Sequence, residues 1–218
     1  MENERGKLFV VEGGVGCGKS TQLRLLSDEI RSSEPGRVWH VYREPGSTEF
    51  GELMRHAVQD RRPDGQDFPV HPYASLFAYS AARANLIRLR VIPDLEQGIN
   101  VGLDRFWYST YGYQGADGVS KPVIFALSLI ATRGLKPDVV LHYDLDPVIG
   151  QARKMKLNED VDRFDAKALA YHQVVRKNYH ELKLLFPGIW EVIDASQPIE
   201  KVKERSLSVL RKHGVIYG

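Results

Sequence analysis

The chain has 218 residues, of which 43% are hydrophobic and 27% charged, an ordinary composition for a globular protein of one or two domains. Its net charge of +2 is too small to indicate nucleic acid or an anionic membrane as the main partner. A single cysteine excludes an intrachain disulfide, the polar first residues do not resemble a signal segment, and no apolar run is long enough to span a bilayer. We therefore expect a cytoplasmic protein that binds neither nucleic acid nor membranes.

Strand-like and helix-like segments alternate along the chain, which favours a parallel sheet covered by helices on both faces. We predict strands over residues 8–12, 38–43, 99–104, 138–143 and 190–194. Several of them end at a charged residue: Glu12, Arg43, Asp104 and Asp194. Ligands bind beyond the carboxyl ends of the strands in such sheets, so these residues are candidates for a site.

Helical periodicity fills the intervals between the strands. A helix over residues 50–58 is expected to bury one apolar side: Phe50, Leu53, Met54, Ala57 and Val58. Further helices are predicted over 73–90, before a break or kink at Pro93, and over 122–133 and 166–186. The last helix is predicted to begin after Pro198 and to bury four residues: Ile199, Val202, Val209 and Leu210.

The segment from Gly13 to Ser20 fits G-x-x-x-x-G-K-[ST], the pattern of a loop that binds nucleotide phosphates. It follows a predicted strand and precedes a helix-like segment, so backbone N–H groups and a helix N-terminus can meet an anion. Lys19 is then expected to reach the β- and γ-phosphates, and the Ser20 hydroxyl to ligate Mg²⁺. The alternative is a glycine-rich turn that binds nothing, but the full pattern and both flanks argue against it.

Charged residues after two strands extend this hypothesis. Asp104 ends a predicted strand, where phosphate-loop enzymes place an acidic residue that helps to hold Mg²⁺. Arg105 follows, and adjacent side chains diverge on an extended segment, so the two can serve a metal and a phosphate. Arg43 precedes a Glu-Pro-Gly turn that would aim it across the sheet edge toward a phosphate. A surface ion pair at Asp104 and Arg105 is the alternative.

Two further groups are compatible with a nucleotide but do not require one. Tyr79 and Arg83 lie four residues apart and share a helix face, so one could stack on a nucleobase while the other donates to it. A core tyrosine beside an arginine that extends to solvent is the alternative. Residues 151–156 carry three positive charges, which could cover a triphosphate or could form a solvated helix face.

Taken in order, these segments resemble the thymidylate kinase family over roughly residues 8–210. The phosphate loop alone is shared by many NTPases, whereas the segments Arg43–Thr48 and Asp104–Gln114 at these separations are more specific. The resemblance implies one domain over residues 1–218 with a P-loop NTPase fold: a three-layer α/β structure, its five-stranded parallel sheet flanked by helices, with a short basic lid at about 151–165. It also implies a homodimer that uses ATP and Mg²⁺ to phosphorylate dTMP to dTDP.

The resemblance assigns roles residue by residue. Catalysis would depend on Lys19, Arg43, Asp104, Arg105, Arg153 and Lys156, and Mg²⁺ on Ser20 and Asp104. ATP would be bound by Gly13, Gly14, Val15, Gly16, Cys17, Gly18, Lys19, Ser20, Thr21, Ser196 and Gln197. dTMP would be bound by Glu12, Arg43, Tyr79, Arg83, Arg105, Thr110, Tyr113 and Gln114. Within that last set the arginines 43 and 105 hold the phosphate, Tyr79 stacks on thymine, Arg83 donates to its O4 edge, and Tyr113 crowds the sugar 2′ position.

One loop position departs from the family. Many thymidylate kinases carry Asp or Glu at the third position, where it contacts the acceptor sugar 3′-OH or the metal, whereas this chain has Val15, which can do neither. Two alternatives follow: a kinase for another deoxynucleoside monophosphate, such as dUMP or a modified pyrimidine, or a nucleotide-binding regulator without catalysis. Glu12 and Asp165 are the acidic residues that could take over the missing contact.

Overall fold

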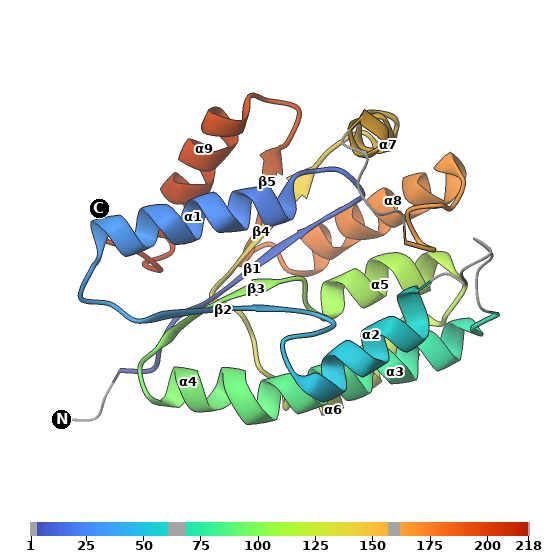
Figure 1. Ribbon diagram of the computed structural model, residues 1–218, viewed down its shortest axis with the longest axis horizontal. Coiled ribbons are helices and arrows are strands. Elements are labelled where there is room, and N and C mark those ends of the chain that lie inside the picture. The colour runs from blue at the N-terminus through green and yellow to red at the C-terminus, as the bar shows by residue number, and fades with distance from the viewer. Residues whose placement is uncertain (1–3, 61–68, 157–161, 218) are drawn as a thin grey trace.

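The computed structural model describes residues 4–60, 69–156 and 162–217 (Figure 1). At the centre of this described chain is a five-stranded parallel sheet in the order β2-β3-β1-β4-β5. Its strands are β1 Leu8–Gly13, β2 Trp39–Arg43, β3 Asn100–Asp104, β4 Val139–Asp144 and β5 Trp190–Asp194. All the predicted strands are confirmed, and every end lies within one residue of its predicted position.

β1 lies in the middle of the sheet and is buried along its whole length. Its side chains alternate between the two faces: Leu8 and Val10 pack into one core, and Phe9 and Val11 into the other. A strand covered on both faces needs such a continuous apolar run. Because β3 and β4 pair with β1 from opposite sides, the loop after β1 leaves the sheet at the switch point between them.

Helices cover both faces of the sheet, which confirms the three-layer α/β architecture (Figure 1). One face carries α1 Lys19–Ser33 and α9 Ile199–Lys212. The other carries α5 Trp107–Ala116, α8 Leu169–Leu185 and a continuous run of α3 Pro72–Leu86, the π-helical turn η1 Ile87–Val91 and α4 Ile92–Glu96. α2 Glu49–Gln59 and α6 Lys121–Thr132 pack against α3, and α7 Pro147–Lys156 follows β4. No helix in the described ranges is long and apolar enough to cross a membrane.

Two expected core faces are wrong in part. On α2 only Val58 of the five expected residues is buried, whereas Phe50 is 42% and Leu53 59% exposed. The cause is that α2 packs on α3 and not on the sheet, so most of its apolar side lies outside the core. On α9 the expected residues are buried except Ile199, which is 57% exposed because it begins the helix at the rim of a cavity.

Pro93 does not end the helix in which it lies. The helical run continues through it to Glu96, directly after the π-helical turn Ile87–Val91. The missing N–H of a proline here leaves the carbonyl of residue 89 without its usual partner, and that residue lies within the π-helical turn. In place of the predicted break or kink at Pro93, the helix therefore changes to a π-helical turn just before it.

α7 meets the phosphate loop backbone against backbone. A Cβ added at Gly16 would lie 2.0 Å from the carbonyl oxygen of Gly150, and one added at Gly150 would lie 2.2 Å from that of Val15. Neither position has room for a larger residue, because both obstructing atoms belong to the main chain. The close approach therefore depends on glycine at both positions, and it seats the helix that carries Arg153 and Lys154 directly on the loop.

We expect Gly150→Ala to destabilise the protein by about 1–3 kcal/mol, because overpacking outweighs the better helix propensity of alanine. Gly188→Ala is the matched control, since a Cβ there would meet no atom within 4 Å. Urea unfolding of the wild type and the two variants measures the difference. Equal midpoints for the two variants would contradict the close contact between α7 and the loop.

Candidate active site

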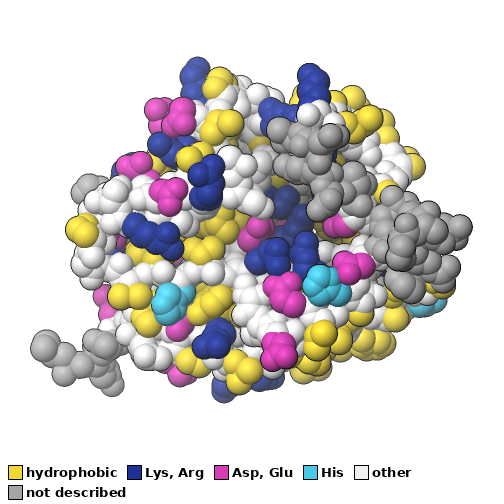
Figure 2. All heavy atoms as spheres, in the orientation of Figure 1, with side chains coloured by type: hydrophobic (Ala, Val, Ile, Leu, Met, Phe, Trp, Pro, Cys, Tyr) yellow, Lys and Arg dark blue, Asp and Glu magenta, His cyan; other side chains and the backbone are white. Residues whose placement is uncertain are grey.

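The carboxyl ends of the strands open into a cavity of 830 Å³. Figure 2 shows Lys and Arg side chains gathered in a hollow near the middle of the corresponding face. Of the predicted site residues, the cavity wall contains Val15, Gly16, Cys17, Gly18, Lys19, Ser20, Thr21, Arg43, Tyr79, Arg83, Asp104, Arg105, Thr110, Tyr113, Gln114, Arg153, Lys156, Ser196 and Gln197. The fold thus brings together segments far apart in the sequence, while Glu12, Gly13 and Gly14 do not line the cavity.

The phosphate loop connects β1 to α1 and leaves the start of that helix open. Gly18 precedes α1 with a left-handed φ of 86°, and no side chain caps the helix or places a negative charge in its first turn. The first N–H groups of α1 are therefore free for an anion. Lys19 is 8% exposed and donates from Nζ to the Gly14 carbonyl (2.8 Å), so its ammonium group already lies over the loop.

Ser20 and Asp104 lie side by side at the end of α1 nearest the sheet. The Ser20 hydroxyl donates to Oδ2 of Asp104 (3.0 Å), and the other carboxylate oxygen, Oδ1, is buried with no hydrogen-bond partner in the described chain. A hydroxyl and a carboxylate are the oxygen ligands that suit Mg²⁺ at a nucleotide site. Among the described residues there is no cluster of three or more His, Cys, Asp or Glu side chains that could hold a metal ion.

Three arginines converge on one side of the cavity. Arg43 donates from Nη2 to both carboxylate oxygens of Glu52 (2.9 and 3.0 Å), and Arg105 donates to the Ser109 hydroxyl (2.9 Å). Arg55 forms no hydrogen bond or ion pair in the described chain, and its pKa is lowered by burial and by the positive charges of Arg43 and Arg105. Like charges held together in this way predict an anion between them.

Arg105 does not continue β3 in an extended conformation, as the sequence led us to expect. Its φ is 71°, in the left-handed region, and its N–H donates to the carbonyl of Val11 (3.0 Å). The chain therefore turns sharply after Asp104, and the Arg105 side chain lies over the ring of Tyr113, 5.2 Å from the ring centre. The side chains of Asp104 and Arg105 still point in different directions, but the cause is this turn and not the alternation of side chains along a strand.

The far end of the cavity is lined by buried polar groups. Arg83 is 4% exposed and donates from Nε to Glu44 (2.5 Å) and from Nη2 to the Thr110 hydroxyl (3.2 Å). In the described chain Nη1 of Arg83 and Nε2 of Gln114 have no hydrogen-bond acceptor. The ring of Tyr79 lies beside them and beside Phe164, with ring centres 6.3 Å apart. This end therefore combines unpaired N–H donors with aromatic surface.

Burial raises the pKa of Glu44 to about 7, although the charge of Arg83 opposes this shift. Neither Glu44 nor Arg55 was singled out from the sequence. Arg55 lies on the polar side of the helix predicted over 50–58, where nothing distinguishes it from a solvated arginine. Glu44 lies in the Pro-Gly turn after β2, where the sequence predicts a role for Arg43 alone, and the packing of α3 places Arg83 against it.

Glu12 does not lie in the cavity wall, contrary to the expectation that it binds dTMP. It is fully buried, and its carboxylate accepts from the N–H groups of Phe106 (2.8 Å) and Ser109 (3.1 Å) and from the hydroxyls of Ser109 (2.7 Å) and Tyr179 (2.9 Å). Burial raises its pKa, while the charge of Arg105 and these hydrogen bonds oppose the rise. The carboxylate is occupied within the protein and does not reach the cavity.

Cations from α7 line one side of the cavity. Arg153 donates to the carbonyl of Ala195 (2.9 Å), Lys154 pairs with Asp165, and Lys156 lines the wall. Ser196 and Gln197 lie opposite, both bonded to the side chain of Asp194. The expected lid over 151–165 is thus helical in its first part, and its residues 157–161 lie outside the described residues.

Comparison with known proteins agrees with this geometry. The family model described as thymidylate kinase matches residues 11–205. A thymidylate kinase of Thermoanaerobacter sp. (strain X514) is 33% identical over 96% of this chain and 99% of its own length. Those of Roseiflexus sp. (strain RS-1) and Nostoc punctiforme are 37% and 34% identical, over 91% and 95% of this chain and 91% and 97% of their own lengths.

We expect Glu12→Ala to lower the free energy of unfolding by roughly 3 kcal/mol or more, because it leaves two buried N–H groups and two hydroxyls without their hydrogen-bond acceptor. Glu200→Ala is the control, since that carboxylate pairs only with Lys203 in the described chain and is exposed. Urea unfolding should separate Glu12→Ala clearly from the control. A Glu12→Ala midpoint equal to that of the wild type would mean that the buried carboxylate does not hold these elements together.

Proposed function

This chain belongs to the thymidylate kinase family, and we propose that it transfers the γ-phosphoryl group of ATP to the phosphate of dTMP within the cavity described above. One observation carries the proposal: one cavity joins the phosphate loop to the arginines 43, 55 and 105 and to N–H donors of Arg83 and Gln114 that have no acceptor among the described residues. That arrangement offers a place for two phosphorylated ligands and for a base with carbonyl oxygens. No observation favours the two alternatives drawn from Val15.

On the donor side, the backbone N–H groups of the loop and of α1 bind the ATP phosphates. Lys19 exchanges its bond to the Gly14 carbonyl for the β- and γ-phosphates. Arg153 and the segment around Ser196 and Gln197 border the space for the adenosine. Ser20 and Asp104 would hold Mg²⁺, which when bound neutralises charge on the phosphates.

On the acceptor side, Arg105 and Arg43 hold the dTMP phosphate, and Arg55 adds a third positive charge. Thymine lies at the end lined by Tyr79, with Arg83 donating to a carbonyl oxygen and Thr110 or Gln114 completing the contacts. Tyr113 lies against Arg105 and borders the sugar. An acceptor phosphate is already anionic at neutral pH, so the transfer needs little help from a general base.

Catalysis is then a matter of position and charge. Arg43, Arg55 and Arg105 reduce the repulsion between the two anions as they approach. Lys19 and the α7 residues Arg153 and Lys156 offset charge that develops during transfer. A location in the cytoplasm stays a prediction from the composition, because a chain with one cysteine and no intrachain disulfide suits a reducing compartment.

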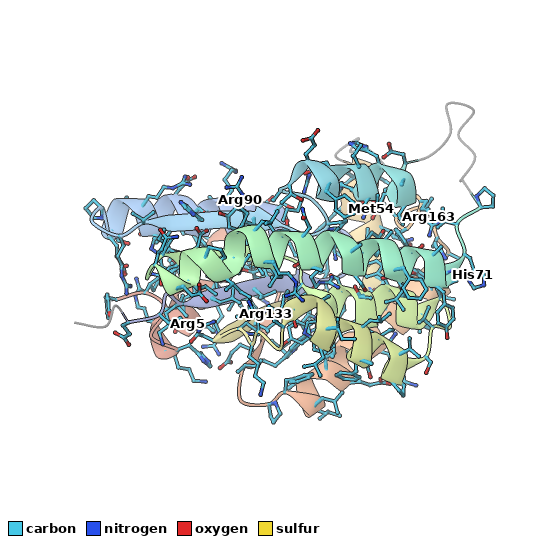
Figure 3. The ribbon with its side chains drawn as sticks, turned by 90° about the horizontal axis from the view of Figure 1, so that it is seen from below. Arg5, Met54, His71, Arg90, Arg133 and Arg163 are labelled. Carbon is cyan, nitrogen blue, oxygen red and sulfur yellow. The ribbon has the colours of Figure 1, made fainter. Side chains whose placement is uncertain are left out.

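We also propose that the protein is a homodimer formed through α2, α3 and α6. These helices run side by side, as the views in Figures 1 and 3 show, with α2 marked by Met54 and the start of α3 by His71. They expose large apolar side chains: Phe50, Leu53, Phe77, Leu129 and Ile130. Apolar residues exposed on neighbouring helices are typical of an interface, and a second copy offers the same surface in return.

ATP consumption measured separately with dTMP, dUMP, UMP, dCMP and dAMP tests the proposed reaction. We expect turnover with dTMP and little with UMP. Lys19→Ala should lower turnover at least about a hundredfold, because a lost charge contact of this kind raises the barrier by several kcal/mol. Lys201→Ala on the exposed side of α9 is the control and should retain wild-type turnover. Unchanged turnover in a folded Lys19→Ala variant would overturn the mechanism.

Light scattering tests the dimer. We expect a mass twice the 24.7 kDa of the chain for the wild type. Leu53→Glu should shift this mass to that of one chain, because a buried carboxylate without a partner is costly at an interface. Leu184→Glu, on the exposed end of α8, should leave the mass unchanged. A wild-type mass of one chain would contradict the proposal.

A further inference from the structure

We propose that Glu44 determines base specificity by positioning Arg83, so that this wall of the cavity accepts a base with the hydrogen-bonding edge of thymine or uracil and rejects that of cytosine. The inference rests on the proposed function. It concerns a residue that does not contact the reacting phosphates: Glu44 orients Arg83 through one carboxylate oxygen and presents the other, Oε1, to the base.

The contacts fix Arg83 through two of its three nitrogens. Glu44 Oε2 accepts from Nε (2.5 Å), the Thr110 hydroxyl accepts from Nη2 (3.2 Å), and both partners are almost fully buried. Glu44 itself is held in place because its N–H donates to the carbonyl of Asp104 (2.9 Å). A planar guanidinium held at two nitrogens has one direction left for its third, so the direction of Nη1 follows from Glu44.

The polar atoms left without partners in this wall form a distinctive set. Around Arg83, within the described chain, they are two donors, Nη1 of Arg83 and Nε2 of Gln114, and one acceptor, Oε1 of Glu44. A further acceptor, Oε1 of Gln59, belongs to the part of the wall beside Tyr79. The Watson–Crick edge of thymine or uracil offers two carbonyl oxygens and one N–H, which complements two donors and one acceptor. Cytosine offers an amino group and an unprotonated ring nitrogen in place of one carbonyl and the N–H, so it would leave polar groups of this wall unpaired.

Stability alone does not account for the buried ion pair of Glu44 and Arg83. A buried ion pair generally adds little stability compared with apolar side chains of similar size, because both charges must be removed from water. This pair also leaves one oxygen of Glu44 and one nitrogen of Arg83 without partners in the described structure, although the two side chains lie in the cavity wall. The arrangement is better explained by the ligand that completes it.

Glu44→Gln tests the inference, because it keeps the shape of the side chain but removes the charge and turns one acceptor into a donor. We expect KM for dTMP to rise at least about tenfold while KM for ATP stays within about twofold, and the ratio of kcat/KM for dTMP over dCMP to fall at least about tenfold. Glu181→Gln is the matched control: its carboxylate also pairs with a cation, Lys121, and accepts from Tyr111, but it lies outside the cavity.

Calorimetry of dTMP and dCMP binding to the same proteins keeps the test decisive if a variant turns over poorly. Glu44→Asp, which keeps the charge but withdraws it from Arg83, should also lose the preference for dTMP, and it replaces Glu44→Gln if that variant fails to fold. A folded variant that keeps the wild-type dTMP to dCMP ratio overturns the role of Glu44. A wild type that fails to phosphorylate dTMP instead overturns the proposed function.

Discussion

The arrangement of the site depends on one buried carboxylate. Glu12, at the end of the central strand, accepts hydrogen bonds from the start of α5 and from Tyr179 of α8, and so ties the origin of the phosphate loop to both helices. Ser109, one of its donors, also accepts from Arg105, so the same contact orients a guanidinium in the cavity. Buried contacts of Glu12, and not the loops that line the cavity, thereby hold the two halves of the cavity in position relative to each other.

The charges of the cavity follow from this frame. Three cations of the cavity wall are held or crowded by the protein: Arg83 by Glu44, Arg43 by Glu52, and Arg55 by two neighbouring guanidinium groups. Cations fixed in this way need little rearrangement when an anion arrives, which is the condition under which electrostatic stabilisation of a transition state is most effective. The close seat of α7 on the loop places Arg153 in the same rigid frame.

Local patterns in the sequence were sufficient for the strands, the phosphate loop and the order of the layers, because burial on both faces demands apolar runs and glycine is required at sharp turns. They were not sufficient where the outcome depends on packing between distant segments. The apolar side of α2 predicts burial, but the spacing of its apolar residues does not say which surface covers them. The helix α5 is rich in aromatic residues and glycine, which have low helix propensity, so its sequence does not predict a helix. Arg55 and Glu44 became visible as site residues only once α2 and α3 were placed beside the sheet.

The same reasoning bears on Val15, the loop position that departs from the family. Its side chain is 6% exposed and lies close to Gly150, so it belongs to the contact that seats α7 on the loop. Val15 also lines the cavity, and its apolar side chain packs beside Gly150 without placing a charge against the main chain of α7. Around it, Lys19 lies over the loop through its bond to the Gly14 carbonyl, and Ser20 contacts Asp104. A packing role therefore accounts for Val15 without requiring that the catalytic function be lost.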